Sequence, residues 1–352
     1  MSRRQRSTTA RGVAYAVVIP TVGRPCLREC LRALADATGP EPVRIVVVDD
    51  RPGPPRGGPV RPGADLPLDA LGPLRGRVSV LRTRGRGPAG ARNAGLRAVG
   101  DVPWTVFLDD DVRVGPDWRE RLRADLTAAS PTTAGVQGVL EVPLPSGRRP
   151  TDWERNTAGL ETARWATADM AFRTAALASV NGFDERFPRA FREDADLALR
   201  LQAAGHDLTS GTRRTRHPVR PADPWVSVKA QRGNADDALM CAVHGPDWWR
   251  RAAAPRGRIR RHAAVAACGL AALALGLSGR RRAAALAGTG WLVGTAEFAG
   301  ARIAPGPRTA GEIATMLVTS VLIPPLAVYH RLAGEVRHRA APRPPRRGEA
   351  RR

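Results

Sequence analysis

The sequence predicts an α/β protein in which a sheet flanked by helices is followed by a C-terminal helical region. Four short β-branched or apolar runs alternate with helix-compatible stretches over the first third of the chain. This alternation is typical of a parallel sheet with helices on its faces. Acidic residues directly follow two of the runs, at the edge where such sheets bind ligands. With 352 residues, 43% of them hydrophobic, the chain is long enough for one large domain and an appendage.

Gly, Pro or Asp bounds each expected strand, and the Pro- and Gly-rich stretch 51–76 is interpreted as a surface loop. Residues 213–224 are expected to be irregular and to close the domain. The expected strands are residues 15–19, 44–48, 78–81 and 105–108, and the expected helices are residues 26–37, 89–99, 167–179 and 194–204.

The formal net charge of +23 comes almost wholly from arginine, since Lys229 is the only lysine. A basic chain prefers anionic partners, namely nucleotide phosphates, anionic lipid or nucleic acid. The four cysteines form no CxxC pair, which indicates neither a zinc site nor a disulfide framework and favours a reducing compartment. The basic N-terminus is followed by a strand-like run and not by an export signal.

Two motifs at strand ends suit a nucleotide. Asp49 and Asp50 follow the second run, where carboxylates can accept hydrogen bonds from a base or ribose; a turn or helix-capping role is the alternative. The Gly-rich turn at residues 85–95 leads into a helix and offers backbone N–H groups and Arg92 to phosphate, although a Gly-rich turn alone is a weak signal.

Two further motifs are acidic. Asp109, Asp110 and Asp111 end the fourth run, and carboxylates packed this closely favour a bound cation over a solvated turn. Glu193 and Asp194 begin an expected helix, where the helix dipole alone would also favour acids.

Taken together, the motifs resemble the family 2 glycosyltransferases of the GT-A fold, a Rossmann-like mixed sheet flanked by helices. The resemblance covers residues 14–217 and rests on VVIPTVGR, VVVDDRP, GPAGARNAG, FLDDD, NGFDERF and REDADLALR, in the family's order. The stretches RRPTDWERNTAGLE and GNADDALMCAVHG are similar to an actinobacterial subgroup of these enzymes.

The resemblance implies a nucleotide-sugar donor site. Asp49 and Asp50 would contact the nucleoside, and Pro20 and Thr21 would line the same pocket. Arg92 would face the base or the diphosphate.

It also implies a metal and a base. Asp109 and Asp111 are similar to the acidic pair of a DxD motif that binds Mn²⁺ or Mg²⁺, with Asp109 nearer the ribose and Asp110 as the surplus acid. His217 lies where some relatives supply a further ligand, and a structural histidine is the alternative. Asp194 matches the family's catalytic base, with Glu193 beside it.

Sugar transfer from a nucleoside diphosphate needs a cation for the leaving group and a base for the acceptor, and acidic residues can hold the cation and act as the base. A divalent cation stabilises a diphosphate leaving group without proton transfer. A carboxylate can take the acceptor's proton, which is worth roughly 10² to 10⁴ in rate. One base without a second nucleophilic carboxylate favours a single displacement, and the implied reaction inverts the anomeric carbon.

Beyond residue 258 the chain is rich in Ala, Leu and Gly between arginine clusters. It contains three apolar stretches, residues 262–278, 283–301 and 313–329. Against the ~20 apolar residues of a spanning helix the first is marginal, the second carries Glu297 and many glycines, and the third contains Pro324 and Pro325. Arginines on both sides of the first stretch favour an interfacial or re-entrant hairpin, with a soluble helical subdomain as the alternative. Membrane association would suit a lipid-linked or saccharide acceptor in cell-envelope synthesis, with the catalytic domain on the cytoplasmic side.

Two other functions fit parts of the pattern. A sugar-phosphate nucleotidyltransferase also uses paired acids and a metal but usually needs a lysine for phosphate, and only Lys229 is available. A basic nucleic-acid-binding protein would explain the charge but not the acids at the strand ends, so no nucleic acid is expected. The expected organisation is a basic tail at 1–12, the GT-A domain at 13–222, an acceptor-side extension at 223–257, the apolar helical region at 258–332 with candidate membrane segments, and a disordered Arg/Pro-rich tail at 333–352.

Overall fold

The computed structural model describes residues 13–53 and 65–339 and divides the chain into two compact units. The first unit comprises the described residues up to 141 together with 164–218, and the second comprises 142–163 and the described residues from 219 onward. Residues 142–163 thus group with the C-terminal part of the chain, although they interrupt the first unit in sequence.

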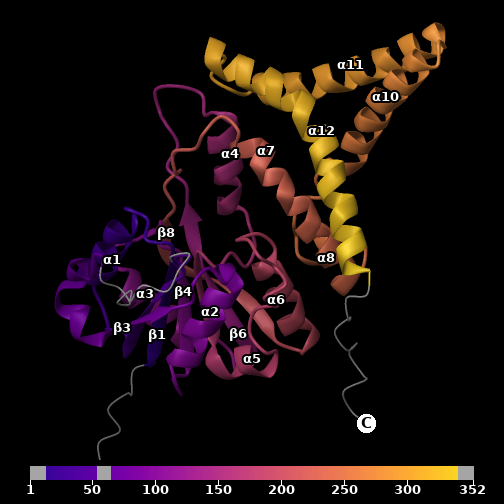
Figure 1. Cartoon of the computed structure of the whole chain (residues 1–352). Helices are drawn as coiled ribbons and strands as arrows, with labels where there is room; N and C mark the ends of the chain where they lie inside the picture. The colour runs from indigo at the N-terminus through magenta and orange to yellow at the C-terminus, as the bar shows by residue number, and fades with distance from the viewer. Residues whose placement is uncertain (1–12, 54–64, 340–352) are drawn as a thin grey trace, which may run out of the picture. The chain divides into compact units, whose positions relative to one another are not determined.

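The first unit is built on one eight-stranded mixed sheet flanked by helices (Figure 1). Its order is β3-β2-β1-β4-β7-β6-β8-β5. The pairs of β1 with β2, β1 with β4 and β2 with β3 are parallel, whereas β7 runs antiparallel to both β4 and β6. The strands are β1 (Tyr15–Thr21), β2 (Arg44–Asp49), β3 (Val78–Arg82), β4 (Trp104–Leu108), β5 (Arg113–Val114), β6 (Thr133–Glu141), β7 (Asp169–Arg173) and β8 (Asp207–Arg216).

The helices of this unit pack through apolar faces of helical period. In α1 the buried residues Leu27, Cys30, Leu31 and Leu34 form one stripe. In α2, Gly95 lets the helix approach the sheet, since a Cβ there would lie 2.3 Å from Cγ1 of Val18. The helices are α1 (Leu27–Asp36), α2 (Gly87–Ala98), α3 (Trp118–Ala128), α5 (Thr174–Ser179) and α6 (Glu193–Ala203).

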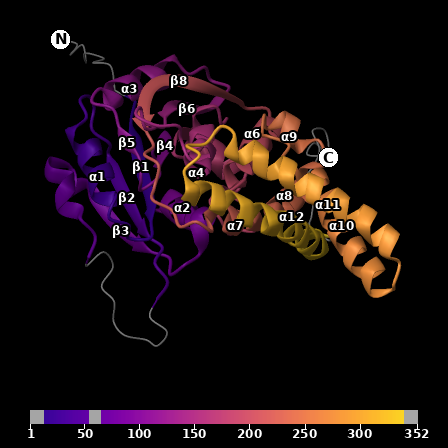
Figure 2. The same cartoon turned by 90° about the horizontal axis from the view of Figure 1, so that it is seen from above.

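The second unit is helical (Figure 2). Its first helix begins with a capping box, in which the Thr151 side chain accepts from the N–H of Glu154 and the Glu154 side chain accepts from the N–H of Thr151. The helices are α4 (Asp152–Ala158), α7 (Val226–Lys229), α8 (Gly233–His244), α9 (Trp248–Arg251), α10 (Ile259–Leu277), α11 (Arg281–Ile303) and α12 (Ala310–His338).

Several expected elements differ from the structure. The helix expected at 167–179 is strand β7 up to Arg173 and helix α5 only afterwards, because apolar and aromatic residues of this stretch lie inside the sheet. The segment expected to be irregular from residue 213 begins in β8. Part of the expected loop at 51–76 belongs to the 3-10 helix Leu68–Arg77, and residues 54–64 lie outside the described residues. Helix α12 extends to His338 through the expected tail, of which residues 340–352 lie outside the described residues.

Candidate functional site

The carboxyl ends of β1, β2 and β4 meet at one edge of the sheet in the first unit. Thr21 is paired in register with Asp49, and Val18 with Phe107, so that Asp109 follows its strand close to the same level. The acids expected to act together are therefore brought to one edge, as the parallel pairing requires.

Asp49 is fully buried at the end of β2, next to Pro20 and Thr21 of the neighbouring strand. Its carboxylate accepts hydrogen bonds from the backbone N–H of Arg51 at 3.1 Å and from the Arg51 guanidinium at 2.8 Å. Burial alone would raise the pKa of Asp49, but the hydrogen bonds and the charge of Arg51 outweigh it and hold the pKa below its ordinary value. Asp49 is therefore a fixed anion at the rim of the sheet.

Asp50 holds the Gly-rich turn. One of its oxygens accepts from the Thr83 hydroxyl at 2.6 Å and from the N–H groups of Gly85 and Arg86, and the other accepts from the N–H of Gly87. These three N–H groups were expected to face phosphate. The structure corrects that expectation, because Asp50 already uses them to fix the start of α2.

Asp110 also has a bracing role. Its two oxygens accept from the Thr21 hydroxyl at 2.6 Å and from the Arg24 guanidinium at 2.8 Å, and the residue is 2% exposed. Thr21, which is expected to line the nucleoside pocket, donates its hydroxyl to Asp110. Arg24 ends the motif VVIPTVGR, and its position after the first strand was the only sequence signal for this contact.

The remaining two acids of the triplet lie beside His217. Asp109, Asp111 and His217 each offer a ligand atom, and these atoms lie within 4.8 Å of one another. The Nε2 atom of His217 is 3.5 Å from an Asp111 oxygen, and its buried Nδ1 has no hydrogen-bond partner. Two carboxylates and an imidazole suit Mn²⁺ or Mg²⁺, and the spacing leaves room for an ion between them, so the residues fit the expected metal.

Arg92 connects this cluster to the start of α6. Its guanidinium donates to Asp109 at 2.8 Å and to Glu193 at 2.7 Å while the residue is 2% exposed. Burial opposes the charge of Arg92, but Asp109 and Glu193 together raise its pKa further above the usual range. The guanidinium is therefore a permanent cation that links Asp109 to Glu193, two acidic residues 84 positions apart in sequence.

Glu193 and Asp194 are neighbours with different surroundings. Glu193 is buried and its second oxygen has no hydrogen-bond partner, so burial raises its pKa, aided by the charge of Asp194 and opposed by Arg92. Asp194 is half-buried and accepts from the N–H of Ala195 at 2.7 Å. Burial also raises the pKa of Asp194, while the Ala195 N–H and the charges of Arg92 and Arg192 act in the opposite direction.

A residue in the left-handed conformation precedes these acids, and the Asn93 side chain joins α2 to residues 183–185. Arg192, at the N-cap of α6, has φ 76°, a left-handed conformation that non-glycine residues seldom adopt. The Asn93 side chain accepts from the N–H of Phe183 and donates to its carbonyl and to Glu185. Sequence reasoning gave neither Arg192 nor Asn93 a role, since a backbone angle and a long-range brace leave no local signal.

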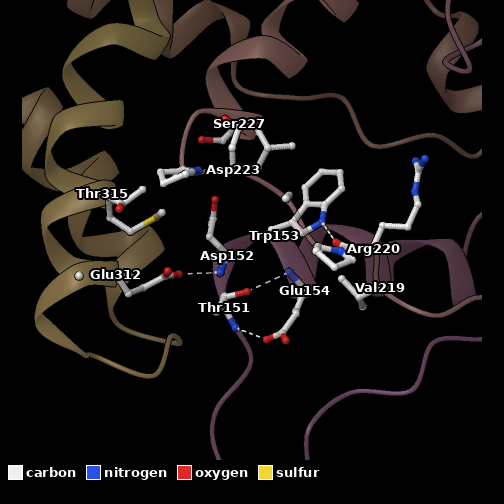
Figure 3. Close-up of a pocket in the computed structure, with 16 residues that line it drawn as sticks. Thr151, Asp152, Trp153, Glu154, Val219, Arg220, Asp223, Ser227, Glu312 and Thr315 are labelled. Atoms are coloured by element: carbon white, nitrogen blue, oxygen red, sulfur yellow. Dashed lines mark hydrogen bonds between the residues drawn. The ribbon is translucent and has the colours of Figure 1, made fainter. Parts of the chain in front are cut away.

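The second unit contains a separate pocket of about 410 Å³ between the start of α4, residues 219–227 and the start of α12 (Figure 3). Its acids already have partners within the unit. The Glu312 side chain accepts from the N–H of Asp152, and Asp152 is paired with Arg302. The indole N–H of Trp153 donates to the carbonyl of Arg220. None of the residues predicted for the catalytic site lines this pocket.

Comparison with known proteins gives one family match, which covers a little under half of the chain. The family model for glycosyl transferase family 2 matches residues 16–181. Together with the mixed sheet, this match confirms the predicted GT-A fold. No curated protein matches the chain.

Two solved structures are similar at low identity. TarS from S. aureus is 16% identical, with a TM-score of 0.39, over 67% of this chain and 41% of that chain. GalNAc-T7, solved with UDP, GalNAc and Mn²⁺, is 16% identical, with a TM-score of 0.46, over 67% of this chain and 52% of that chain. The matched parts thus span about half or less of these proteins.

Proposed function

We propose that the chain is an enzyme that transfers a sugar from a nucleotide-sugar to an acceptor hydroxyl, and the match of residues 16–181 to the glycosyl transferase family 2 model supports this. The observation that carries the proposal is a continuous chain of charged contacts. It runs from the cluster of Asp109, Asp111 and His217 through Arg92 to Glu193, which adjoins Asp194. The buried Arg92 side chain would thereby fix the position of the proposed leaving-group site relative to the proposed base.

Asp109, Asp111 and His217 would hold Mn²⁺ or Mg²⁺, which when bound stabilises the negative charge that develops on a departing nucleoside diphosphate. Asp49 would accept hydrogen bonds from the nucleoside, with Pro20 lining the same pocket. Asp50 and Thr21 would hold the Gly-rich turn and Asp110 in place. Asp49 is itself bonded to Arg51, so the nucleoside would share this carboxylate with the Arg51 side chain.

Asp194 would act as the catalytic base. In the proposed reaction the acceptor oxygen forms a bond to the anomeric carbon as its proton passes to an Asp194 oxygen. The bond from that carbon to the diphosphate oxygen breaks, and the electron pair leaves with the nucleoside diphosphate. The absence of an assigned carboxylate nucleophile favours this single displacement, which inverts the anomeric configuration. Glu193 would position Arg92 and would not touch the substrate, because it is buried and paired.

We assign the catalytic chemistry to residues 13–222 and the acceptor side to residues 223–257. The apolar helices that follow favour a lipid-linked or saccharide acceptor of the cell envelope, with catalysis at the cytoplasmic face of the membrane. Two of these helices, α10 and α12, are long and apolar enough to cross a membrane.

The proposal is tested by the thermal stability of the full chain with UDP, GDP, CDP and dTDP, each with and without Mn²⁺. We expect one or two of the diphosphates to stabilise the protein only when the metal is present. A ligand at a hundred times its dissociation constant contributes about 2.7 kcal/mol. Equal shifts without metal would contradict the metal site, and no shift with any diphosphate would contradict the donor site.

Two matched variants locate the effect. Asp111→Asn removes a proposed ligand and should abolish the metal-dependent shift. Asp110→Asn alters the adjacent acid, whose oxygens bond Thr21 and Arg24, and should lower the starting stability while the metal-dependent shift remains. If both variants lose the shift equally, the assignment of metal ligands within the triplet is wrong.

A further inference from the structure

Helices α10 and α11 of the second unit form an antiparallel hairpin joined by a short turn (Figures 1 and 2). Every residue from 263 to 294 is described, and none of them is buried. Leu277 is 91% exposed, Leu286 is 77% exposed and Leu270 is 70% exposed. A soluble protein seldom leaves so much contiguous apolar surface uncovered.

The two helices pack on each other through small residues. A Cβ added at Gly294 would lie 2.5 Å from Cγ2 of Val265, and one added at Gly269 would lie 2.9 Å from Cδ1 of Trp291. Gly290 and Gly294 are spaced as GxxxG, and a Cβ at Gly290 would lie 3.1 Å from the sulfur of Cys268. Close packing on glycine is typical of helix pairs within lipid, and the side chains of Leu270, Leu277 and Leu286 remain exposed.

Charged residues are confined to the two ends of the hairpin. Residues 263–279 and 283–296 contain no charged side chain. At the open end, Arg258 and Arg261 pair with Glu297. At the closed end, the residues 280–282 are all arginine.

The spacing of the two charged ends is close to the thickness of a bilayer's hydrocarbon core. Arg261 and Arg280 are separated by about 28 Å along α10 at a rise of about 1.5 Å per residue. Arg282 and Glu297 are separated by about 22 Å along α11. The core measures about 30 Å, and arginine side chains extend toward the headgroups and cover the difference.

A helix that lies flat on a membrane needs a charged face along its length. The uncharged intervals of α10 and α11 have none, so an interfacial hairpin, one of the two arrangements that the arginine clusters favoured from sequence alone, is not the better fit. The other arrangement was a re-entrant hairpin. We propose that the α10–α11 hairpin inserts upright into an anionic lipid bilayer, with Arg280, Arg281 and Arg282 among the headgroups of the far leaflet. This inference does not depend on the proposed catalytic activity.

Cysteine accessibility in vesicles of phosphatidylcholine and phosphatidylglycerol tests the proposal with the full chain. One variant keeps Cys268 alone, with the other three cysteines replaced by alanine, and carries an environment-sensitive dye. A second variant adds Arg281→Cys to a cysteine-free chain, and a reference variant adds Asp101→Cys, an exposed position of the first unit. The metal-dependent nucleotide shift or, failing that, the unfolding transition shows that each variant is folded.

We expect lipid-borne quenchers to reduce the emission of the dye at Cys268. In vesicles to which the protein has been added from outside, a membrane-impermeant thiol reagent should label the Asp101→Cys variant at once. It should label the Arg281→Cys variant only after detergent is added. Immediate labelling at position 281 would overturn the upright arrangement in favour of a flat or re-entrant one. Absence of lipid quenching with a dimer in solution would overturn it in favour of a second copy of the chain covering the hairpin.

Discussion

The adjacent acids Glu193 and Asp194 should respond to neutral substitution in opposite ways. Glu193→Gln keeps the side-chain shape but replaces a charged hydrogen bond to the buried Arg92 guanidinium with a neutral one. Hydrogen bonds to charged groups contribute about 1.5–3 kcal/mol, and the Arg92 Nε already lacks a partner. Because burial also penalises the ionised form of Glu193, part of this loss is offset, and we expect the free energy of unfolding to fall by about 2 kcal/mol.

Asp194→Asn should leave stability within about 1 kcal/mol, since an amide oxygen can still accept from the N–H of Ala195. Its turnover should fall by roughly 10² to 10⁴, the contribution of a general base. Nucleoside diphosphate binding should be retained, because Asp194 is assigned no contact with the donor.

Urea unfolding of both variants, together with release of nucleoside diphosphate from a panel of nucleotide-sugars, measures the two effects. The reasoning would be refuted if Asp194→Asn lost stability while Glu193→Gln lost only turnover. Donor binding lost in Asp194→Asn with turnover remaining would also contradict the role of base.

Two further changes probe the electrostatics and the scaffold. Arg192→Asn suits the left-handed backbone and removes a cation that lowers the pKa of Asp194, so this pKa should rise further. Since a base must be ionised, the acid limb of the pH–rate profile should move to higher pH, whereas Arg123→Gln, at an exposed position of α3, should leave the profile unmoved. Asp169→Asn breaks a fully buried ion pair with Arg213 and should lower the free energy of unfolding by about 3–5 kcal/mol in urea denaturation. Asp117→Asn, in an exposed ion pair with Arg121, should lower it by at most about 1 kcal/mol in the same assay.

The sequence predicted the first half of the sheet well because its strands carry their own signal. β1, β2 and β4 are continuous apolar runs that lie buried among other strands, and each was expected within two residues of its observed ends. β8 was missed because its sequence, DLTSGTRRTR, has no apolar alternation. Its place in the sheet depends on long-range pairing, since Arg213 is fully buried between Asp125 and Asp169.

The candidate site was predicted as a set of positions but not as a set of contacts. The sequence could not show which acids of the triplet face the metal site and which bond protein donors. The directions in which adjacent side chains of a turn point depend on the backbone conformation. In the structure Asp110 accepts hydrogen bonds from Thr21 and Arg24, whereas Asp109 and Asp111 lie beside His217. The assignment of Asp109 and Asp111 as metal ligands stays a prediction.

Each of the three acidic motifs contains one acid with a structural role and at least one acid assigned to the reaction. This explains why each motif contains more acids than the chemistry needs. Asp50, Asp110 and Glu193 bond protein donors and are assigned no ligand. Each lies next to an acid that is assigned to substrate, metal or proton transfer in addition to its own protein contact. A carboxylate held by donors within the protein fixes the backbone from which its neighbour projects, and a position error near 1 Å in a reacting group can cost 10²-fold in rate. Loss of a bracing acid would therefore also lower activity, but through stability and geometry. Activity alone cannot separate the two kinds of acid, whereas unfolding and ligand binding measured side by side can.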